Sequence, residues 1–168
     1  MYKAIVRLLA RRTLARLSNG ELDRFLMLFN ESSVFCFYGD HALGGEVRGR
    51  EAVRALFERV FRLFPGVRIE PIAIAVNGWP WNSLVATRFT VRAELPDGSE
   101  YRNEGMQYLR LRMGKVVEDR LYEDTAALVD VLAVLARLGN EEATAPPLGP
   151  LLAEGAGITP GSSNVTAA

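Results

Sequence analysis

Apolar residues recur with a helical period over the first third of the chain. The clearest run follows Arg50, where apolar side chains fall at positions i, i+3, i+4, i+7, i+8 and i+11. These side chains are Val53, Leu56, Phe57, Val60, Phe61 and Phe64. The spacing predicts a helix that Pro65-Gly66 ends. Two earlier helices are expected, one up to about Leu17 and one opening at Ser18-Asn19-Gly20-Glu21, which has capping-box spacing.

Most of the remaining pattern is typical of strands. The segment 34–38 is β-branched and aromatic, which predicts a strand. The longer strand candidates are residues 67–76, 84–95, 101–112 and 115–123. Turn sequences at Pro96-Asp97-Gly98-Ser99 and Met113-Gly114 predict antiparallel hairpins. A last helix, capped at Asp124-Thr125 and running to about Leu138, is apolar on nearly every side, so it must be covered.

The composition changes after Leu138. Pro, Gly, Ala, Ser and Thr dominate from Gly139 onward, and no apolar period persists. We therefore expect one α+β domain over residues 1–138, followed by a flexible Pro/Gly/Ala-rich tail over residues 139–168. A chain of 168 residues has room for one such domain.

Charge and cysteine content exclude several classes of function. Twenty basic residues balance twenty acidic ones, which argues against general nucleic-acid binding. The single Cys and single His exclude a disulfide framework and argue against a metal site built from these ligands. No apolar run approaches the roughly 18 residues of a membrane span, and the cytoplasm is the expected compartment.

The first helix carries charge of one sign. Its basic residues are Lys3, Arg7, Arg11, Arg12 and Arg16, and the first twenty residues contain no acid. We interpret it as an amphipathic helix that packs an apolar stripe against the domain. Binding of this helix to a membrane surface is the alternative.

Four local motifs give this α+β pattern a family likeness. They are Phe29-Asn30-Glu31, Gly49-Arg50-Glu51-Ala52-Val53, Leu95-Pro96-Asp97-Gly98 and Gly114-Lys115-Val116-Val117-Glu118. Over about residues 1–138 the chain resembles the nuclear-transport-factor-2-like superfamily, which includes SnoaL-like polyketide cyclases, ketosteroid isomerase and limonene-epoxide hydrolase. The resemblance implies a cone-shaped, curved, mostly antiparallel sheet wrapped around N-terminal helices, with a C-terminal helix and an apolar pocket at the open end.

The resemblance also implies that the best-known reaction centres of the superfamily are absent. The arginine of the epoxide hydrolase falls on Arg88, but its carboxylates fall on Thr90 and Leu121. The water-activating arrangement of that enzyme therefore cannot form. The base of the steroid isomerase falls on Phe37, or on Asp40 if a gap intervenes.

The same resemblance implies which side chains line the pocket. They are Phe35, Phe37, Arg88, Thr90, Arg92, Tyr101, Asn103, Gln107, Asp119, Leu121 and Glu123. Simple alternation disagrees on the strand at 84–95, where it buries Phe89 and Val91 and leaves Arg88 in solvent. We follow the family register, with the opposite face of the sheet covered by a second subunit.

Asp119 is the predicted catalytic residue. A carboxyl group in an apolar pocket has a raised pKa, which suits proton transfer near neutral pH. The alternative is a structural ion pair with Arg88 or Arg92. His41, on a Gly-rich loop, is expected at the pocket rim. The segment Trp79-Pro80-Trp81 is expected to flank the mouth, either as packing or as a ligand clamp.

Together these features predict a small-molecule pocket protein of the SnoaL-like group, with neither cofactor nor metal. If it is an enzyme, we expect an isomerase, cyclase or dehydratase that transfers a proton on an apolar substrate. The alternative is a non-catalytic ligand-binding or dimerisation module. A homodimer is expected through the strand face of Val85, Phe89 and Val91 together with the last helix.

Overall fold

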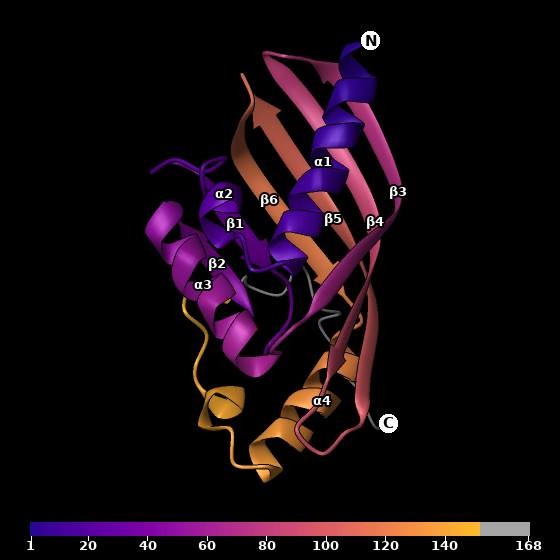
Figure 1. Cartoon of the computed structure of the whole chain (residues 1–168). Helices are drawn as coiled ribbons and strands as arrows, with labels where there is room; N and C mark the ends of the chain where they lie inside the picture. Colours follow the sequence, from indigo (N-terminus) through magenta and orange to yellow (C-terminus); the bar gives the residue numbers. More distant parts are fainter. Residues whose placement is uncertain (152–168) are drawn as a thin grey trace, which may run out of the picture.

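The computed structural model describes residues 1–151 and contains helices on one side of a single sheet (Figure 1). The helices are α1 (Tyr2–Ser18), α2 (Leu22–Leu26), α3 (Arg50–Leu63), α4 (Thr125–Arg137) and the short 3-10 helix η1 (Glu141–Thr144). The strands are β1 (Val34–Phe37), β2 (Gly45–Arg48), β3 (Arg68–Trp79), β4 (Asn82–Glu94), β5 (Glu100–Arg112) and β6 (Lys115–Glu123). The α+β class is confirmed.

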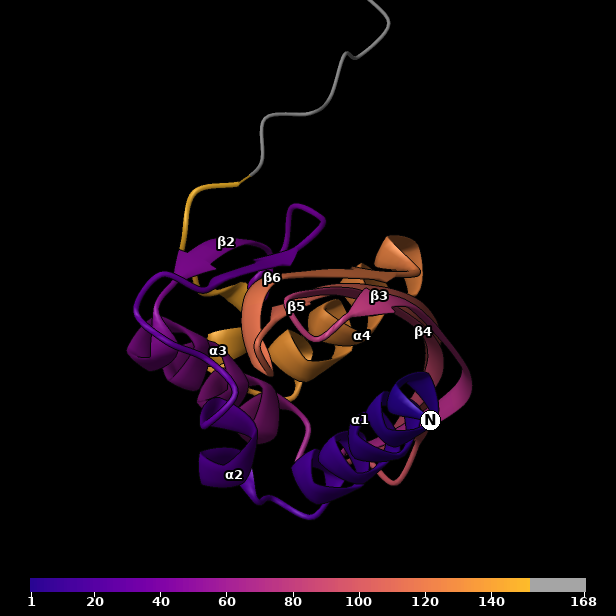
Figure 2. The same ribbon diagram turned by 90° about the horizontal axis from the view of Figure 1, so that it is seen from above.

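The sheet has six strands in the order β2-β1-β6-β5-β4-β3. The pairing of β1 with β6 is parallel, and every other pairing is antiparallel. The sheet is curved and open, and α1 and α4 lie within its concave side (Figure 2). The sequence pattern missed β2, because four residues that begin with a glycine and alternate with charged side chains give little strand signal.

Local sequence explains how the flanking helices begin and end. Gly20, with φ of 78°, turns the chain out of α1. Ser18 belongs to α1 and donates from its hydroxyl to the Leu14 carbonyl oxygen, so the predicted capping box does not form. The predicted cap of α4 does form, since the Asp124 carboxylate accepts from the N–H groups of Ala126 and Ala127.

Side chains on the concave face of the sheet are buried by helices of the same chain. Val6 of α1 packs against Val76 and Val85. Phe89 and Val91 belong to the main core, which α2, α3 and α4 complete. The prediction that a second subunit covers this strand face is therefore wrong. Within one chain, the curved sheet already wraps its apolar face around helices.

The register of β4 is the one that simple alternation predicts. Val85 pairs with Leu109 and Phe89 with Gly105, so the odd-numbered residues of β4 face the helices. The even-numbered residues Arg88 and Thr90 lie on the outer face. The expectation that these two line the pocket is wrong, because a shift of one residue moves every side chain of a strand to the other face.

The segment that follows α4 packs on the domain as far as the structure describes it. Arg62 of α3 pairs with Glu142 of η1 at 2.6 Å. The Arg59 guanidinium donates to the carbonyl oxygens of Ala42 and Pro146, both at 2.8 Å. Residues 139–150 therefore belong to the folded domain, and the predicted boundary at 138 is wrong for them. The rest of the predicted tail, residues 152–168, lies outside the described residues.

The end of this segment reaches the free edge of the sheet. The Glu46 N–H of β2 donates to the Pro150 carbonyl oxygen at 3.0 Å. Gly149 allows the close approach, because a Cβ atom there would lie 1.9 Å from the Glu46 carbonyl oxygen. We call residues 139–150 the C-terminal strap. Among residues 1–151, no helix combines the length and the apolar character that crossing a membrane requires.

Candidate functional site

A small apolar cavity lies between α3, α4 and the concave face of the sheet. Its lining consists of twelve apolar side chains together with Tyr101 and Glu123. The apolar side chains are Phe35, Phe37, Leu43, Leu56, Phe57, Val60, Phe64, Val67, Ile69, Val91, Leu121 and Leu128. Its free volume is about 50 Å³, room for only a few water molecules. The polar chemistry of the cavity is therefore confined to two side chains.

Glu123 and Tyr101 belong to a hydrogen-bonded cluster that Asn103 organises. The Asn103 amide donates to the Tyr101 hydroxyl at 2.7 Å and to Glu123 Oε2 at 3.3 Å. It also contacts the Asp124 carbonyl oxygen at 3.0 Å, which ties the cluster to the start of α4. The Tyr101 hydroxyl lies 3.5 Å from Glu123 Oε2. One carboxylate oxygen thus has two neutral donors beside it.

Burial sets the protonation of this cluster. Desolvation raises the pKa of Glu123 to about 7, and the hydrogen bond from Tyr101 offsets part of that rise. Desolvation also raises the pKa of Tyr101 well above its usual range, so its hydroxyl stays protonated and can donate. Glu123 is therefore a carboxyl group that can accept or release a proton near neutral pH, next to a fixed hydroxyl donor.

Gly105 makes room for the Glu123 side chain. It pairs with Glu123 across β5 and β6, and a Cβ atom at Gly105 would lie 2.9 Å from Glu123 Cγ. The same Cβ would lie 2.5 Å from Phe89 Cζ. The missing side chain lets the aromatic ring and the carboxyl group share one stretch of the concave face.

Asp119 lies deeper on the same face of β6 and does not line the cavity. Only 1% of its surface is exposed. Its Oδ2 accepts from the Gln107 amide at 2.9 Å, and its Oδ1 has no hydrogen-bond partner among residues 1–151. Desolvation raises the pKa of Asp119 to about 7, and the Gln107 hydrogen bond offsets part of that rise. The alternative of an ion pair with Arg88 or Arg92 is excluded, because both arginines lie on the other face.

Besides Asp119, six of the ten predicted site residues lie in or next to this site. Some line the cavity, one belongs to its polar cluster, and one donates a hydrogen bond to Asp119. The six are Phe35, Phe37, Tyr101, Asn103, Gln107 and Leu121. Arg88 does not join them, because on the outer face it pairs with Glu104 at 2.5 Å. Thr90 lies on that outer face too, beside Glu104 in the register.

His41 has a structural role in the loop that follows β1. Its Nδ1 accepts from the Leu43 N–H at 3.2 Å, so the proton is on Nε2, which donates to the Tyr38 carbonyl oxygen at 3.2 Å. Its ring meets Phe37 edge to face, with centroids 5.0 Å apart. Desolvation lowers the pKa of His41, which favours this neutral form.

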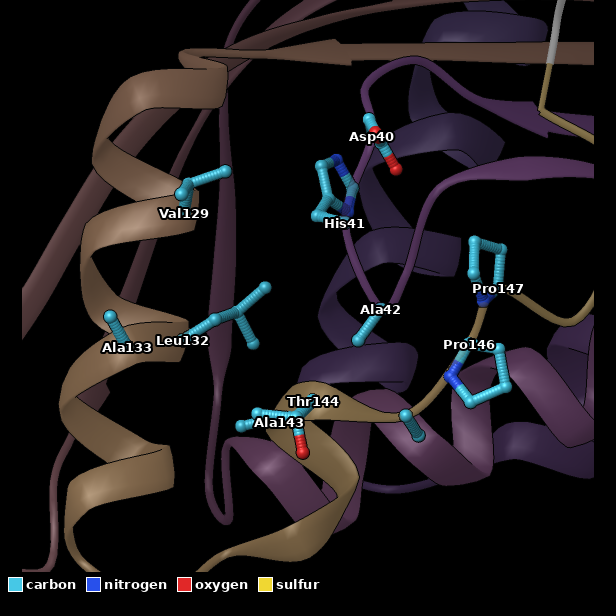
Figure 3. A pocket seen from close by; sticks show the side chains of 11 residues that line it. Asp40, His41, Ala42, Val129, Leu132, Ala133, Ala143, Thr144, Pro146 and Pro147 are labelled. Carbon is cyan, nitrogen blue, oxygen red and sulfur yellow. The ribbon is translucent and has the colours of Figure 1, made fainter.

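A second and larger pocket, of about 410 Å³, lies between α4, the loop that follows β1 and the strap (Figure 3). It separates Val129 and Ala133 of α4 from the loop that carries Asp40 and His41, and the strap closes it at Pro146. His41 thus lies beside this outer pocket instead of the cavity in the cone. Both of its ring nitrogens are engaged, so its imidazole offers no free group to a ligand.

Glu123 is the candidate functional side chain that the sequence pattern placed on the pocket face but did not single out. Its signal is the period of two along β6, which sets Asp119, Leu121 and Glu123 on one face. Only the tertiary structure shows that the cavity reaches Glu123 and ends before Asp119. Within residues 1–151, no group of three or more His, Cys, Asp or Glu side chains could hold a metal ion.

Comparisons with known proteins agree with this architecture. The family model described as SnoaL-like domain matches residues 10–119. No curated protein matches the sequence significantly. PrhC from Penicillium brasilianum superposes with a TM-score of 0.71 at 17% identity, over 85% of this chain and 96% of PrhC.

Two further solved structures share the fold. TerC, crystallised with polyporic acid, has a TM-score of 0.61 at 16% identity over 75% of this chain and 95% of its own. IdmH from Streptomyces antibioticus, a candidate polyketide cyclase, has a TM-score of 0.57 at 20% identity over 71% of this chain and 92% of its own. At these identities the likeness concerns the fold.

Proposed function

This chain belongs to the SnoaL-like domain family, and on that premise we propose that it binds an apolar small molecule in the cone and transfers a proton on it without a cofactor. One observation carries the proposal: among residues 1–151, Glu123 is the only carboxyl group that lines a cavity whose other lining is apolar apart from Tyr101. A titratable group with a raised pKa in such a cavity is a candidate acid or base.

The proposed step is an isomerisation in which Glu123 moves the proton. The Glu123 carboxylate takes a proton from a carbon next to a substrate carbonyl, and the electron pair moves onto the carbonyl oxygen. The Tyr101 hydroxyl donates a hydrogen bond to that oxygen as its charge develops. Glu123 then returns the proton at another carbon, so the carboxylate is regenerated and no oxidant or reductant is consumed.

Substrate entry requires the cavity to widen. A free volume of about 50 Å³ is well below the several hundred Å³ of a typical small-molecule site. Leu128 of α4 forms part of the lining, and Asn103 joins β5 to the residue that precedes α4. Movement of α4 is therefore the proposed route by which a substrate reaches Glu123.

Exchange of carbon-bound hydrogen for deuterium provides a test that needs no known substrate. Wild-type protein is incubated in D₂O with a panel of apolar cyclic ketones, including 2-tetralone, and exchange is followed by proton NMR. Glu123→Gln should slow the catalysed exchange on the order of 10²–10⁴-fold, as loss of a general base does. Tyr101→Phe should slow it less, while binding of the apolar dye anilinonaphthalene sulfonate persists in both variants.

Glu104→Gln is the matched control, because Glu104 is a neighbouring glutamate on the outer face of β5. It should leave exchange unchanged. Asp119→Asn separates the two buried acids. If Asp119→Asn removes the exchange and Glu123→Gln does not, the base is Asp119, as the sequence alone predicted. If the wild type catalyses no exchange above the buffer rate on the panel, the proton-transfer proposal fails.

A non-catalytic binding or dimerisation module is the second candidate function, and the small volume of the cavity favours it. In this case apolar dye would bind without any exchange. We also propose a cytoplasmic homodimer that associates through the outer face of the sheet. Exposed Met106 and Tyr122 lie side by side there, and such residues are enriched in interfaces. Light scattering of wild type and Met106→Glu tests the assembly.

A further inference from the structure

The outward side of α1 carries exposed apolar side chains. Val6, Leu14 and Leu17 are its buried residues. On the opposite side, Ile5, Leu8 and Leu9 are exposed to about half of their surface. At 100° per residue, these three fall within one third of the helix circumference, so they form a continuous stripe that faces away from the domain.

Basic side chains adjoin this stripe along one of its sides and continue its sector toward the carboxyl end of α1. They are Lys3, Arg7, Arg11, Arg12 and Arg16. None of the salt bridges formed within residues 1–151 uses any of the five. Since the whole chain is neutral and its first twenty residues contain no acid, residues 21–168 carry an excess of acidic residues. The positive charge is therefore concentrated on α1, which implies an anionic partner.

Two tryptophans project from the same end of the molecule. Trp79 is the last residue of β3 and Trp81 lies in the turn that leads to β4, and they are 62% and 63% exposed. Their rings stack in parallel with centroids 5.9 Å apart. They are the only tryptophans in the chain. Exposed stacked indoles cover neither the cavity nor the outer pocket, so the predicted role as a clamp at the cone mouth is not supported.

Hydrogen bonds hold these features together. The Tyr2 hydroxyl lies 2.6 Å from Ser83 Oγ, which joins the amino end of α1 to the β3–β4 hairpin. The Met113 N–H donates to the Pro80 carbonyl oxygen at 2.6 Å, which joins the β5–β6 turn to the same hairpin. Met113 itself is strongly exposed. Figure 1 shows the start of α1 and the β3–β4 hairpin at the end of the sheet opposite α4.

We propose that this end of the protein docks on the surface of an anionic membrane. The docking surface consists of the stripe Ile5, Leu8 and Leu9, the adjoining basic residues of α1, and Trp79, Trp81 and Met113. Indoles favour the boundary between lipid headgroups and acyl chains, and apolar side chains of an interfacial helix enter it. Lysine and arginine reach the lipid phosphates with their charged ends while their stems cover apolar surface.

The mixture of side chains selects a lipid surface over other anionic partners. Nucleic acids are bound by basic side chains that track phosphates, and an exposed aliphatic stripe beside those side chains gains nothing there. An anionic bilayer matches both parts of the surface, the charge at its headgroups and the apolar stripe below them. Docking at this end leaves α4 and the cavity, at the opposite end, free to admit a ligand from solution.

Vesicle binding of the full chain tests the proposal. The protein is mixed with vesicles of phosphatidylcholine alone or of phosphatidylcholine and phosphatidylserine at 7:3, and bound protein is measured by co-sedimentation. Because Trp79 and Trp81 are the only indoles, their emission reports the docking directly. Binding to the anionic vesicles should shift the emission to shorter wavelength, and brominated lipids should quench it. High salt should weaken the binding.

Paired substitutions separate charge from apolar contact. Arg7→Gln with Arg11→Gln should weaken binding on the order of 30-fold, from two cationic side chains near an anionic surface. The matched control, Arg68→Gln with Arg92→Gln, removes two exposed charges from the outer sheet face at the far end of β3 and should bind as the wild type does. Leu8→Ser with Leu9→Ser should abolish the emission shift. Equal melting temperatures would show that all these variants fold.

Several results would overturn the proposal. One is no binding to anionic vesicles at low salt, and another is equal loss in the α1 pair and in the matched control pair. An emission shift on concentrating the protein without lipid would assign the surface to a second copy instead. Tight, salt-sensitive binding to duplex DNA with no emission shift on vesicles would assign it to nucleic acid. Glu123→Gln, which tests the proposed reaction, should leave vesicle binding unchanged.

Discussion

Asp119 and Glu123 lie on the same face of β6, one on each side of Leu121, and burial raises the pKa of both carboxyl groups to about 7. Their surroundings differ. Glu123 borders the cavity beside two neutral donors, whereas Asp119 is enclosed with one amide donor and one oxygen without a partner. One strand thus presents an accessible titratable group and an inaccessible one.

The two raised pKa values predict that the protein becomes more stable as the pH falls from 8 to 5. A carboxyl group whose folded pKa lies above its unfolded value binds its proton more tightly when folded, so stability is lost as the pH rises toward 7. His41 acts in the opposite direction, because its lowered pKa removes stability as the pH falls below about 6.5. With two acids against one histidine, the melting temperature should be higher at pH 5 than at pH 8.

Asp119→Asn should remove part of this pH dependence. Asparagine keeps the shape of the side chain and cannot ionise, so the variant should exceed the wild type in stability at pH 8 by about 1–4 kcal/mol and should approach it at pH 5. Melting curves at both pH values measure the difference. Asp130→Asn, on the exposed side of α4, is the matched control and should follow the wild type. A loss of stability in Asp119→Asn at pH 8 would contradict the prediction.

The C-terminal strap should contribute to stability. A chain ending at Leu138 loses the Arg62–Glu142 ion pair, the Pro146 acceptor of Arg59 and the Pro150 acceptor of β2. Its melting temperature should fall by roughly 5 °C or more, because a few degrees correspond to about 1 kcal/mol in a domain of this size. A chain ending at Leu151 keeps all of these contacts and serves as the control. Equal melting of the two truncated chains would show that the strap adds nothing.

Phe89 should behave as a core residue of one chain. It is 3% exposed and belongs to the main core, so Phe89→Ala should lower the free energy of unfolding by about 3–5 kcal/mol. Thr90→Ala, at the next position on the outer face, should change it by less than about 1 kcal/mol. Urea unfolding measures both. A variant at Phe89 with unchanged stability and altered oligomeric mass would restore the interface interpretation.

The sequence by itself determined the order of the elements and every element except β2 and the short η1. The run from Val53 to Phe64 could only bury its apolar side as a helix, and Asp124 was poised to cap α4 because its carboxylate lies within reach of the next turn. The alternation along β4 correctly predicted that Phe89 faces the core and that Arg88 faces outward. The register implied by the family resemblance placed Arg88 in the pocket instead. A strand with a period of two has one apolar face, and burying that face puts Arg88 on the outer side of the sheet.

Only the tertiary structure decided where the cavity ends. Alternation places Asp119 and Glu123 on one face of β6, but local pattern contains no information on which of them other elements enclose. The strap had the composition of a flexible tail, and long-range contacts with Arg59 and Arg62 of α3 hold it in place. Burial depends on chain segments far apart in sequence, and periodicity reports only on neighbours along the chain.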